Sequence, residues 1–171
     1  MINSKYSDSN KIELLRNIRA AFAHRMMPDD PFIITNPTHT YYGHVSALLA
    51  FDWKHFSTKE EIDEIDFSFP ALSPNGLAFY LPKLLIAVVD KEKLFERSNF
   101  FGDLVLHLGY KPAIFCTKYY TKYQSLNNLE LNTLSEWVDW LELSSLVEGK
   151  FVLRSEIANI RRNIAYLESL K

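Results

Sequence analysis

The sequence has few of the features that mark disulfide-stabilised, nucleotide-binding or membrane-spanning proteins. Its single cysteine, Cys116, cannot form an intramolecular disulfide, which fits a reducing compartment. Five scattered glycines provide no phosphate-binding loop, since such loops need clustered glycines whose amides close on the anion. The most apolar run, Leu84 to Val89, has six residues, whereas a bilayer needs roughly 20. The N-terminal residues MINSKYSDSNKIE lack the apolar stretch of a signal peptide. We expect a cytoplasmic protein with no cofactor and no membrane partner.

An excess of charge of either sign is also missing. The chain has 19 Lys and Arg against 21 Asp and Glu, a net charge of -2, so no overall positive field attracts nucleic acid. The segment from Tyr110 to Gln124 carries three lysines, four tyrosines and no acid, and could contact phosphates and stack bases. Three lysines are few for that task. We therefore expect these tyrosines to lie half-buried at the edge of the core, and we do not expect nucleic acid as a partner.

Apolar residues are abundant and spaced as in helices. With 171 residues, 47% of them hydrophobic, the chain can build one core, so we predict a single domain over residues 1–171. The fold class is mainly α, a compact domain of six to seven helices with room for one or two short strands. The helices are expected at 10–24, 40–49, 58–66, 74–89, 100–108, from 132 or 133 to near 149, and from about 155 onward. The proline-rich stretch after Arg25 should be irregular, with Phe32 lying on the core or in a short strand.

The segment over about 74–89 predicts the central helix. Ser73 can cap its start, and Pro74 fits the first helical position because its missing N–H costs nothing there. The helix is apolar nearly all round, which is typical of a buried helix. Pro82 removes one backbone hydrogen bond, so we predict a kink near Ala78 to Pro82.

The residues after Ser57 predict an acidic helix. Ser57 and Glu60 form the pattern of a capping box. Five carboxylates follow within nine residues with one lysine, a net charge of -4, and we take them, with Asp52, as the candidate partner-binding residues: Asp52, Glu60, Glu61, Asp63, Glu64 and Asp66. Such a band could complement a basic protein and speed association. The alternative is an ordinary solvated helix face.

Two further patterns leave open other kinds of protein. Asp52 and His55, and Asp103 and His107, have spacings that let a carboxylate orient an imidazole, so two converging pairs could bind a metal in an unrecognised enzyme. Isolated pairs of this spacing arise by chance in most chains. Cys116 with His107 could form a nucleophile pair, but nothing in the sequence lowers the thiol pKa, and a buried, inert cysteine is the simpler interpretation.

The apolar stripe from Leu153 to Leu167 could support self-association. It barely reaches two heptads, whereas a coiled coil usually needs three or more. Packing into the core of the same chain is the better interpretation, and we expect a monomer or a weak homodimer.

The block ALSPNGLAFYLPKLLIAV, residues 71–88, resembles the most recognisable part of a family of small bacterial proteins known as a domain of unknown function. The stretches FDWKHFS (51–57) and LNTLSEWVDWL (131–141) are similar to flanking blocks of that family in order and approximate spacing. The similarity extends over residues 12–146, with Asn75-Gly76 and the stretch 110–124 as departures. It implies one small α-rich domain and brings no catalytic residue.

The sequence favours a non-enzymatic protein-binding domain. Small size, slight acidity, the carboxylate band and the absence of catalytic motifs are typical of immunity or antitoxin-like proteins that cover a toxin's basic surface with acidic and aromatic side chains. The alternatives are the metal-dependent enzyme and the self-associating structural module.

Overall fold

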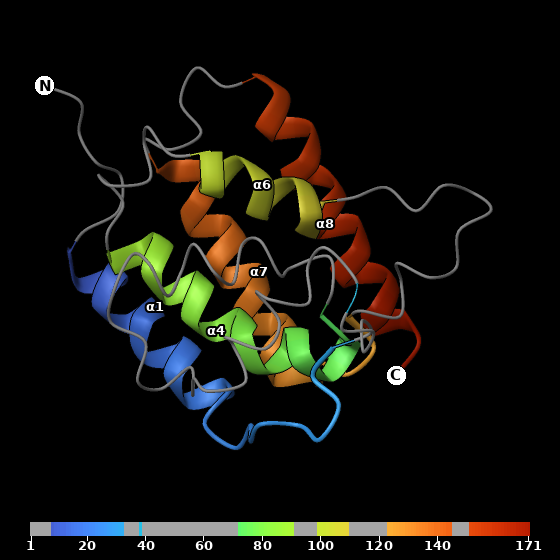
Figure 1. Cartoon of the computed structure of the whole chain (residues 1–171). Helices are drawn as coiled ribbons and strands as arrows, with labels where there is room; N and C mark the ends of the chain where they lie inside the picture. The colour runs from blue at the N-terminus through green and yellow to red at the C-terminus, as the bar shows by residue number, and fades with distance from the viewer. Residues whose placement is uncertain (1–7, 33–37, 39–71, 91–98, 110–122, 145–150) are drawn as a thin grey trace, which may run out of the picture.

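The computed structural model describes residues 8–32, 38, 72–90, 99–109, 123–144 and 151–171 (Figure 1). These residues form five α-helices and no strand: α1 (Asp8–Ala21), α4 (Pro74–Asp90), α6 (Asn99–Leu108), α7 (Asn128–Leu143) and α8 (Phe151–Ser169). The predicted mainly α fold is therefore confirmed. The helices predicted at 40–49 and 58–66 lie outside the described residues, so the predicted total of six to seven stays a prediction. None of the described helices is long and apolar enough to cross a membrane.

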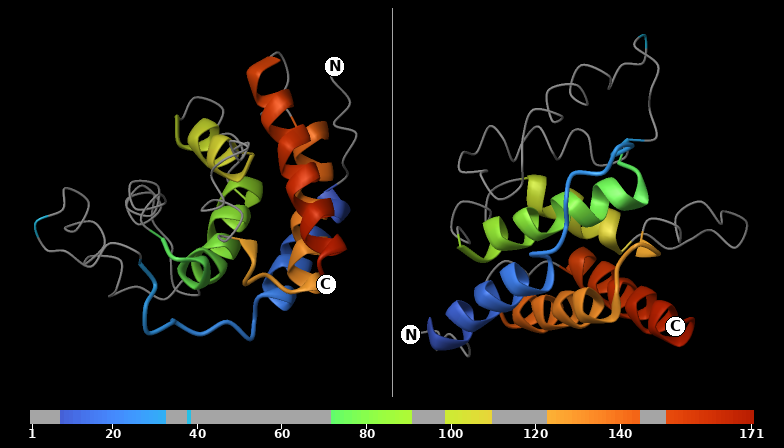
Figure 2. Two further views of the ribbon diagram at one scale, coloured as in Figure 1. Left: turned by 90° about the vertical axis from the view of Figure 1, so that its right-hand side faces the viewer. Right: turned by 90° about the horizontal axis from the view of Figure 1, so that it is seen from below.

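The helices form two layers (Figure 2). One layer contains α1, α7 and α8, with α7 in the middle and packed against both neighbours. The second layer contains α4, which packs on α1, and α6, which packs on α8. Cross-contacts show that α7 runs antiparallel to α1, because Asn17 bonds Glu136 whereas the later Arg25 bonds the earlier Glu130. Buried apolar side chains from all five helices form the core between the layers.

Helix α4 is the buried helix that the sequence predicts. Thirteen of its seventeen residues are buried, and it continues through Pro82 to Asp90. The proline therefore does not end the helix, and the kink itself stays a prediction. The helix begins at Pro74 as expected, and the Ser73 hydroxyl accepts a hydrogen bond from the Gly76 N–H at 3.0 Å. This N-terminal cap satisfies one of the helix's free amides.

The connection after α1 is irregular and crosses to the start of α4. Phe32 is buried on the core and forms an isolated antiparallel bridge with Leu72; the described residues next to it form no strand. The Ser73 N–H donates to the Pro31 carbonyl at 2.8 Å. A Cβ on Gly76 would lie 1.9 Å from that same carbonyl oxygen. Only glycine fits here, because the two backbones are in contact.

Three helices, α1, α7 and α8, have boundaries that differ from the sequence prediction. Helix α1 spans Asp8–Ala21 instead of 10–24. Helix α7 begins at Asn128, four or five residues before the predicted start at Asn132 or Thr133, and ends at Leu143 instead of near Gly149. Helix α8 begins at Phe151 instead of near Ser155. The apolar stripe of α8 is buried in the core of its own chain, as predicted: Leu153, Ile157, Ile160, Ile164 and Leu167.

The end of α6 lies directly against the backbone of α8. Gly109 follows the last turn of α6, and a Cβ there would lie 2.3 Å from the carbonyl oxygen of Glu156. The neighbouring Leu108 carbonyl accepts hydrogen bonds from the Tyr123 hydroxyl at 2.6 Å and from Asn163 Nδ2 at 3.3 Å. These bonds satisfy a carbonyl that a helix C-terminus leaves free.

Replacing Gly109 with alanine should therefore destabilise the protein. We expect Gly109→Ala to lower the free energy of unfolding by about 1–3 kcal/mol, because α6 must move away from α8. The matched control is Gly102→Ala inside α6, since a Cβ at Gly102 meets no atom of the described residues within 4 Å. The control should raise stability by about 0.5–1 kcal/mol through helix propensity. Urea unfolding measures both, and equal effects would contradict the close approach.

The burial of Tyr123 makes the stability of the protein depend on pH in the alkaline range. Loss of water around the hydroxyl raises its pKa far above the usual value. In the unfolded chain the tyrosine hydroxyl ionises at about pH 10. The unfolded state then loses a proton that the folded state keeps, so stability falls as the pH rises above that value. Tyr123→Phe should reduce this alkaline loss of unfolding free energy, and the exposed Tyr166→Phe should not. Indistinguishable pH profiles of the two variants in urea titrations would contradict this account.

Candidate functional site

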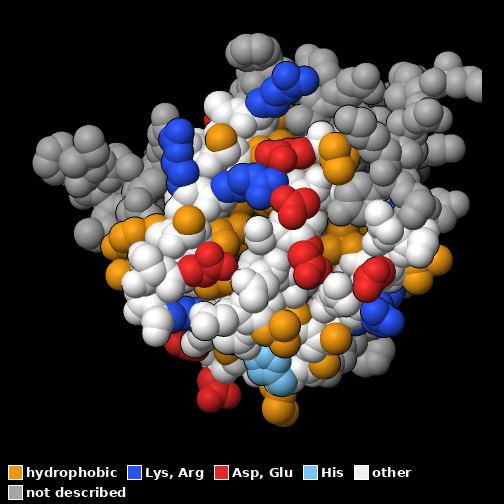
Figure 3. All heavy atoms as spheres, turned by 180° about the vertical axis from the view of Figure 1, so that it is seen from behind, with side chains coloured by type: hydrophobic (Ala, Val, Ile, Leu, Met, Phe, Trp, Pro, Cys, Tyr) orange, Lys and Arg blue, Asp and Glu red, His pale blue; other side chains and the backbone are white. Residues whose placement is uncertain are grey.

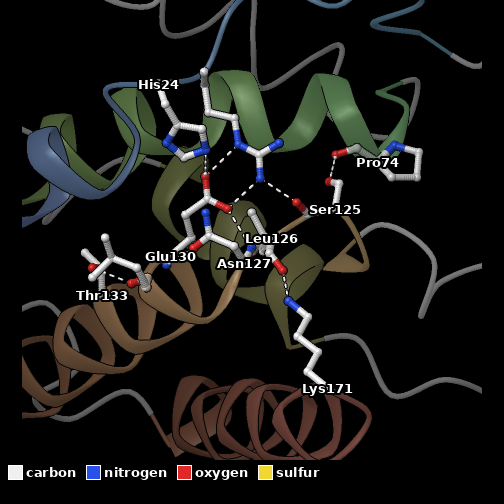
Figure 4. Close-up of polar contacts among 10 residues, drawn as sticks. His24, Pro74, Ser125, Leu126, Asn127, Glu130, Thr133 and Lys171 are labelled. Atoms are coloured by element: carbon white, nitrogen blue, oxygen red, sulfur yellow. Dashed lines mark hydrogen bonds and ion pairs between the residues drawn. The ribbon is translucent and has the colours of Figure 1, made fainter.

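A cluster of charged side chains lies where α1 ends and α7 begins (Figure 4). Arg25 donates to Glu130 twice, from Nε to Oε1 at 2.6 Å and from Nη2 to Oε2 at 2.5 Å. The Glu130 side chain is 0% exposed and that of Arg25 is 18% exposed. A buried carboxylate without a partner would cost several kcal/mol. The two-point contact with Arg25 compensates this charge and fixes the orientation of both groups.

Glu130 also caps the helix on which it lies. Its Oε2 accepts a hydrogen bond from the Asn127 N–H at 2.7 Å, and the Asn127 side chain accepts one from the Glu130 N–H at 3.0 Å. This reciprocal arrangement is a capping box, in which two otherwise free amides are satisfied. The pattern N-x-x-E at 127–130 is visible in the sequence and marks the start of α7, which the predicted start at Asn132 or Thr133 missed.

His24 completes the cluster at the surface. Its Nε2 lies 3.6 Å from Glu130 Oε1, and its side chain is 56% exposed. A histidine beside a carboxylate is an arrangement that proton-transfer sites use. Here, however, both carboxylate oxygens already accept hydrogen bonds from Arg25, and one also accepts from Asn127. The geometry is that of a structural ion pair with a peripheral histidine.

Further hydrogen bonds connect this cluster to other helices. Arg25 Nη2 also donates to the Ser125 carbonyl, and the Ser125 hydroxyl donates to the Pro74 carbonyl at 2.7 Å. Lys171 Nζ, after the end of α8, donates to the Leu126 carbonyl. The segment before α7 is thereby joined to α1, α4 and the C-terminal end of α8 (Figure 4).

An open depression of about 680 Å³ lies beside this segment. It is lined by Gln124, Ser125, Leu126, Asn127, Asn128, Leu129 and Lys171. Among these lining residues, Lys171 alone has a charged side chain. The depression is shallow, and its lining contains no Asp, Glu, His or Cys; the Ser125 hydroxyl donates to the Pro74 carbonyl and the Lys171 ammonium to the Leu126 carbonyl.

The outer face of the layer of α1, α7 and α8 carries charges of both signs (Figure 3). Arg161 of α8 donates to Asp139 at 2.6 Å and to Glu142 at 2.8 Å, both on α7. The hydrogen bond that Arg161 donates to Glu142 is the main reason that the pKa of Arg161 lies above its usual value. Glu136, one turn before Asp139, accepts a hydrogen bond from Asn17 at 3.0 Å. These carboxylates are thus largely satisfied within the protein.

The residues predicted to bind a partner are not part of the described structure. Asp52, Glu60, Glu61, Asp63, Glu64 and Asp66 all lie outside the described residues, and so do His55 and Cys116. His107 is exposed in the last turn of α6, and the side chain of Asp103 is outside the described part. Within the described residues, no group of three or more histidine, cysteine or acidic side chains could hold a metal ion.

Comparisons with protein-family models, with curated proteins and with solved structures find no match to the chain. The resemblance of residues 71–88 to a family of small bacterial proteins therefore stays a prediction. The fold and the site define a two-layered, mainly helical protein in which a polar cluster centred on the buried Glu130 joins helix ends.

The Arg25 and Glu130 pair should be strongly coupled. We expect Arg25→Met and Glu130→Gln each to lower the free energy of unfolding by about 3 kcal/mol, because each leaves a desolvated partner unpaired. The double variant should lose clearly less than the sum of the two. The matched control is the exposed pair Glu13 and Arg16, 3.3 Å apart, whose coupling should stay below about 0.5 kcal/mol. Additive losses for the buried pair, measured by urea unfolding, would show that the two groups act independently.

The capping role of Asn127 can be tested separately. Asn127→Ala removes the acceptor for the Glu130 amide and should cost about 1 kcal/mol of unfolding free energy. Asn128→Ala changes the next residue, which is exposed in the first turn of α7, and should change stability little. The two variants differ by one position, so thermal or urea unfolding compares them directly. A loss of similar size in both would argue against the cap.

Proposed function

We propose that the chain is a non-enzymatic protein-binding domain, of the immunity or antitoxin-like kind, that blocks a bacterial toxin through an acidic and aromatic surface. The observation that carries this proposal is the composition of residues 58–66, where five carboxylates accompany one lysine, a net charge of -4. Since the whole chain has a net charge of -2, the remainder of the chain is net +2. Residues 58–66 are therefore one of two strongly acidic stretches, the other being α7, whose four carboxylates accompany no lysine or arginine.

The carboxylates on the outer face of the described helices support this assignment, because they have partners within the protein. Asp139 and Glu142 share the Arg161 guanidinium, and Glu136 accepts a hydrogen bond from Asn17. A carboxylate with a cationic neighbour at hydrogen-bond distance contributes little to the long-range field of a protein. The acidic segment, with Lys59 as its only cation, is the part of the sequence best suited to attract a basic partner.

The aromatic residues just before this segment supply the second component. The stretch FDWKHFS, residues 51–57, places two phenylalanines and one tryptophan next to the carboxylates in sequence. Aromatic side chains provide most of the binding energy at many protein interfaces, whereas charges around them steer association and select the partner. A partner with a basic groove, such as a nuclease, has the complementary chemistry.

The polar cluster around Glu130 has the geometry of a structural ion pair. Three hydrogen bonds to the carboxylate come from Arg25 and Asn127: the two from Arg25 join the end of α1 to α7, and the one from Asn127 caps α7 itself. The contacts of this cluster are accounted for by folding, so nothing in its geometry favours the metal-dependent enzyme over the binding domain.

Charge reversal tests the proposal. Glu61→Lys with Glu64→Lys should weaken binding to a basic partner at least about 10-fold at low salt, mainly by slowing association. The matched control is Glu13→Lys with Glu168→Lys, which makes the same change in net charge on exposed residues of α1 and α8. The partner is captured on the wild-type protein, identified by mass spectrometry, purified, and titrated calorimetrically at low and high salt. Its enzymatic activity is then assayed with and without the wild-type protein.

The outcomes separate the alternatives. A basic partner whose activity the wild type inhibits, with affinity lost in the first variant and kept in the control, supports the proposal. Equal weakening by both variants would show a non-specific effect of net charge. An affinity that neither variant changes at low salt would place the binding surface elsewhere and overturn the assignment of residues 58–66.

A further inference from the structure

We draw no further inference here: the strongest candidate, the open depression where α7 begins and α8 ends, combines a helix N-terminus with one lysine and the exposed Leu129, and nothing in the described part of the chain shows what covers it.

Discussion

The burial of a single carboxylate, that of Glu130, governs how the helix ends of this protein meet. A charge removed from water needs partners of opposite sign or hydrogen-bond donors, since desolvation otherwise costs more than packing returns. Glu130 has Arg25 on one side and the Asn127 amide on the other. Arg25 follows the end of α1 and also contacts the Ser125 carbonyl, so the requirement sets the position of α1 against α7. Ser125 in turn contacts Pro74, which brings the start of α4 to the same place.

Much of the fold follows from local patterns in the sequence. The apolar composition of residues 74–89 and the Ser73-Pro74 start predict α4, and the three-and-four spacing from Leu153 predicts the buried face of α8. These signals depend on neighbours along the chain, which the sequence displays directly. Helix α7 begins earlier than predicted, although the N-x-x-E capping pattern at 127–130 marks its start locally. The burial of Glu130 is different, because it depends on Arg25, 105 residues earlier, and no local pattern shows that contact.

The candidate binding surface was inferred from composition, whereas the helices were inferred from the spacing of residues. The acidic segment is defined by composition alone, and its residues lie outside the described part of the chain. The described carboxylates show why composition is not sufficient. Asp139 and Glu142 would count as a second acidic group on α7, yet both lie beside Arg161 from α8. The neighbours that the fold supplies decide whether a group of acidic side chains produces a negative potential that attracts a basic partner. For α7 those neighbours are known.

The two glycines at helix contacts have a consequence for tracing the ancestry of this chain. At Gly76 and Gly109 one main chain lies directly on another, so neither position has space for a side chain. Core leucines and isoleucines can be exchanged when total volume is kept, and such positions drift in distant homologues. A glycine at a position where two main chains are in contact cannot be replaced by a larger residue in this way. Distant homologues should therefore share Gly76 and Gly109 together with Arg25 and Glu130, which join α1 to α7. These four residues should identify such homologues better than the hydrophobic residues that dominate the composition.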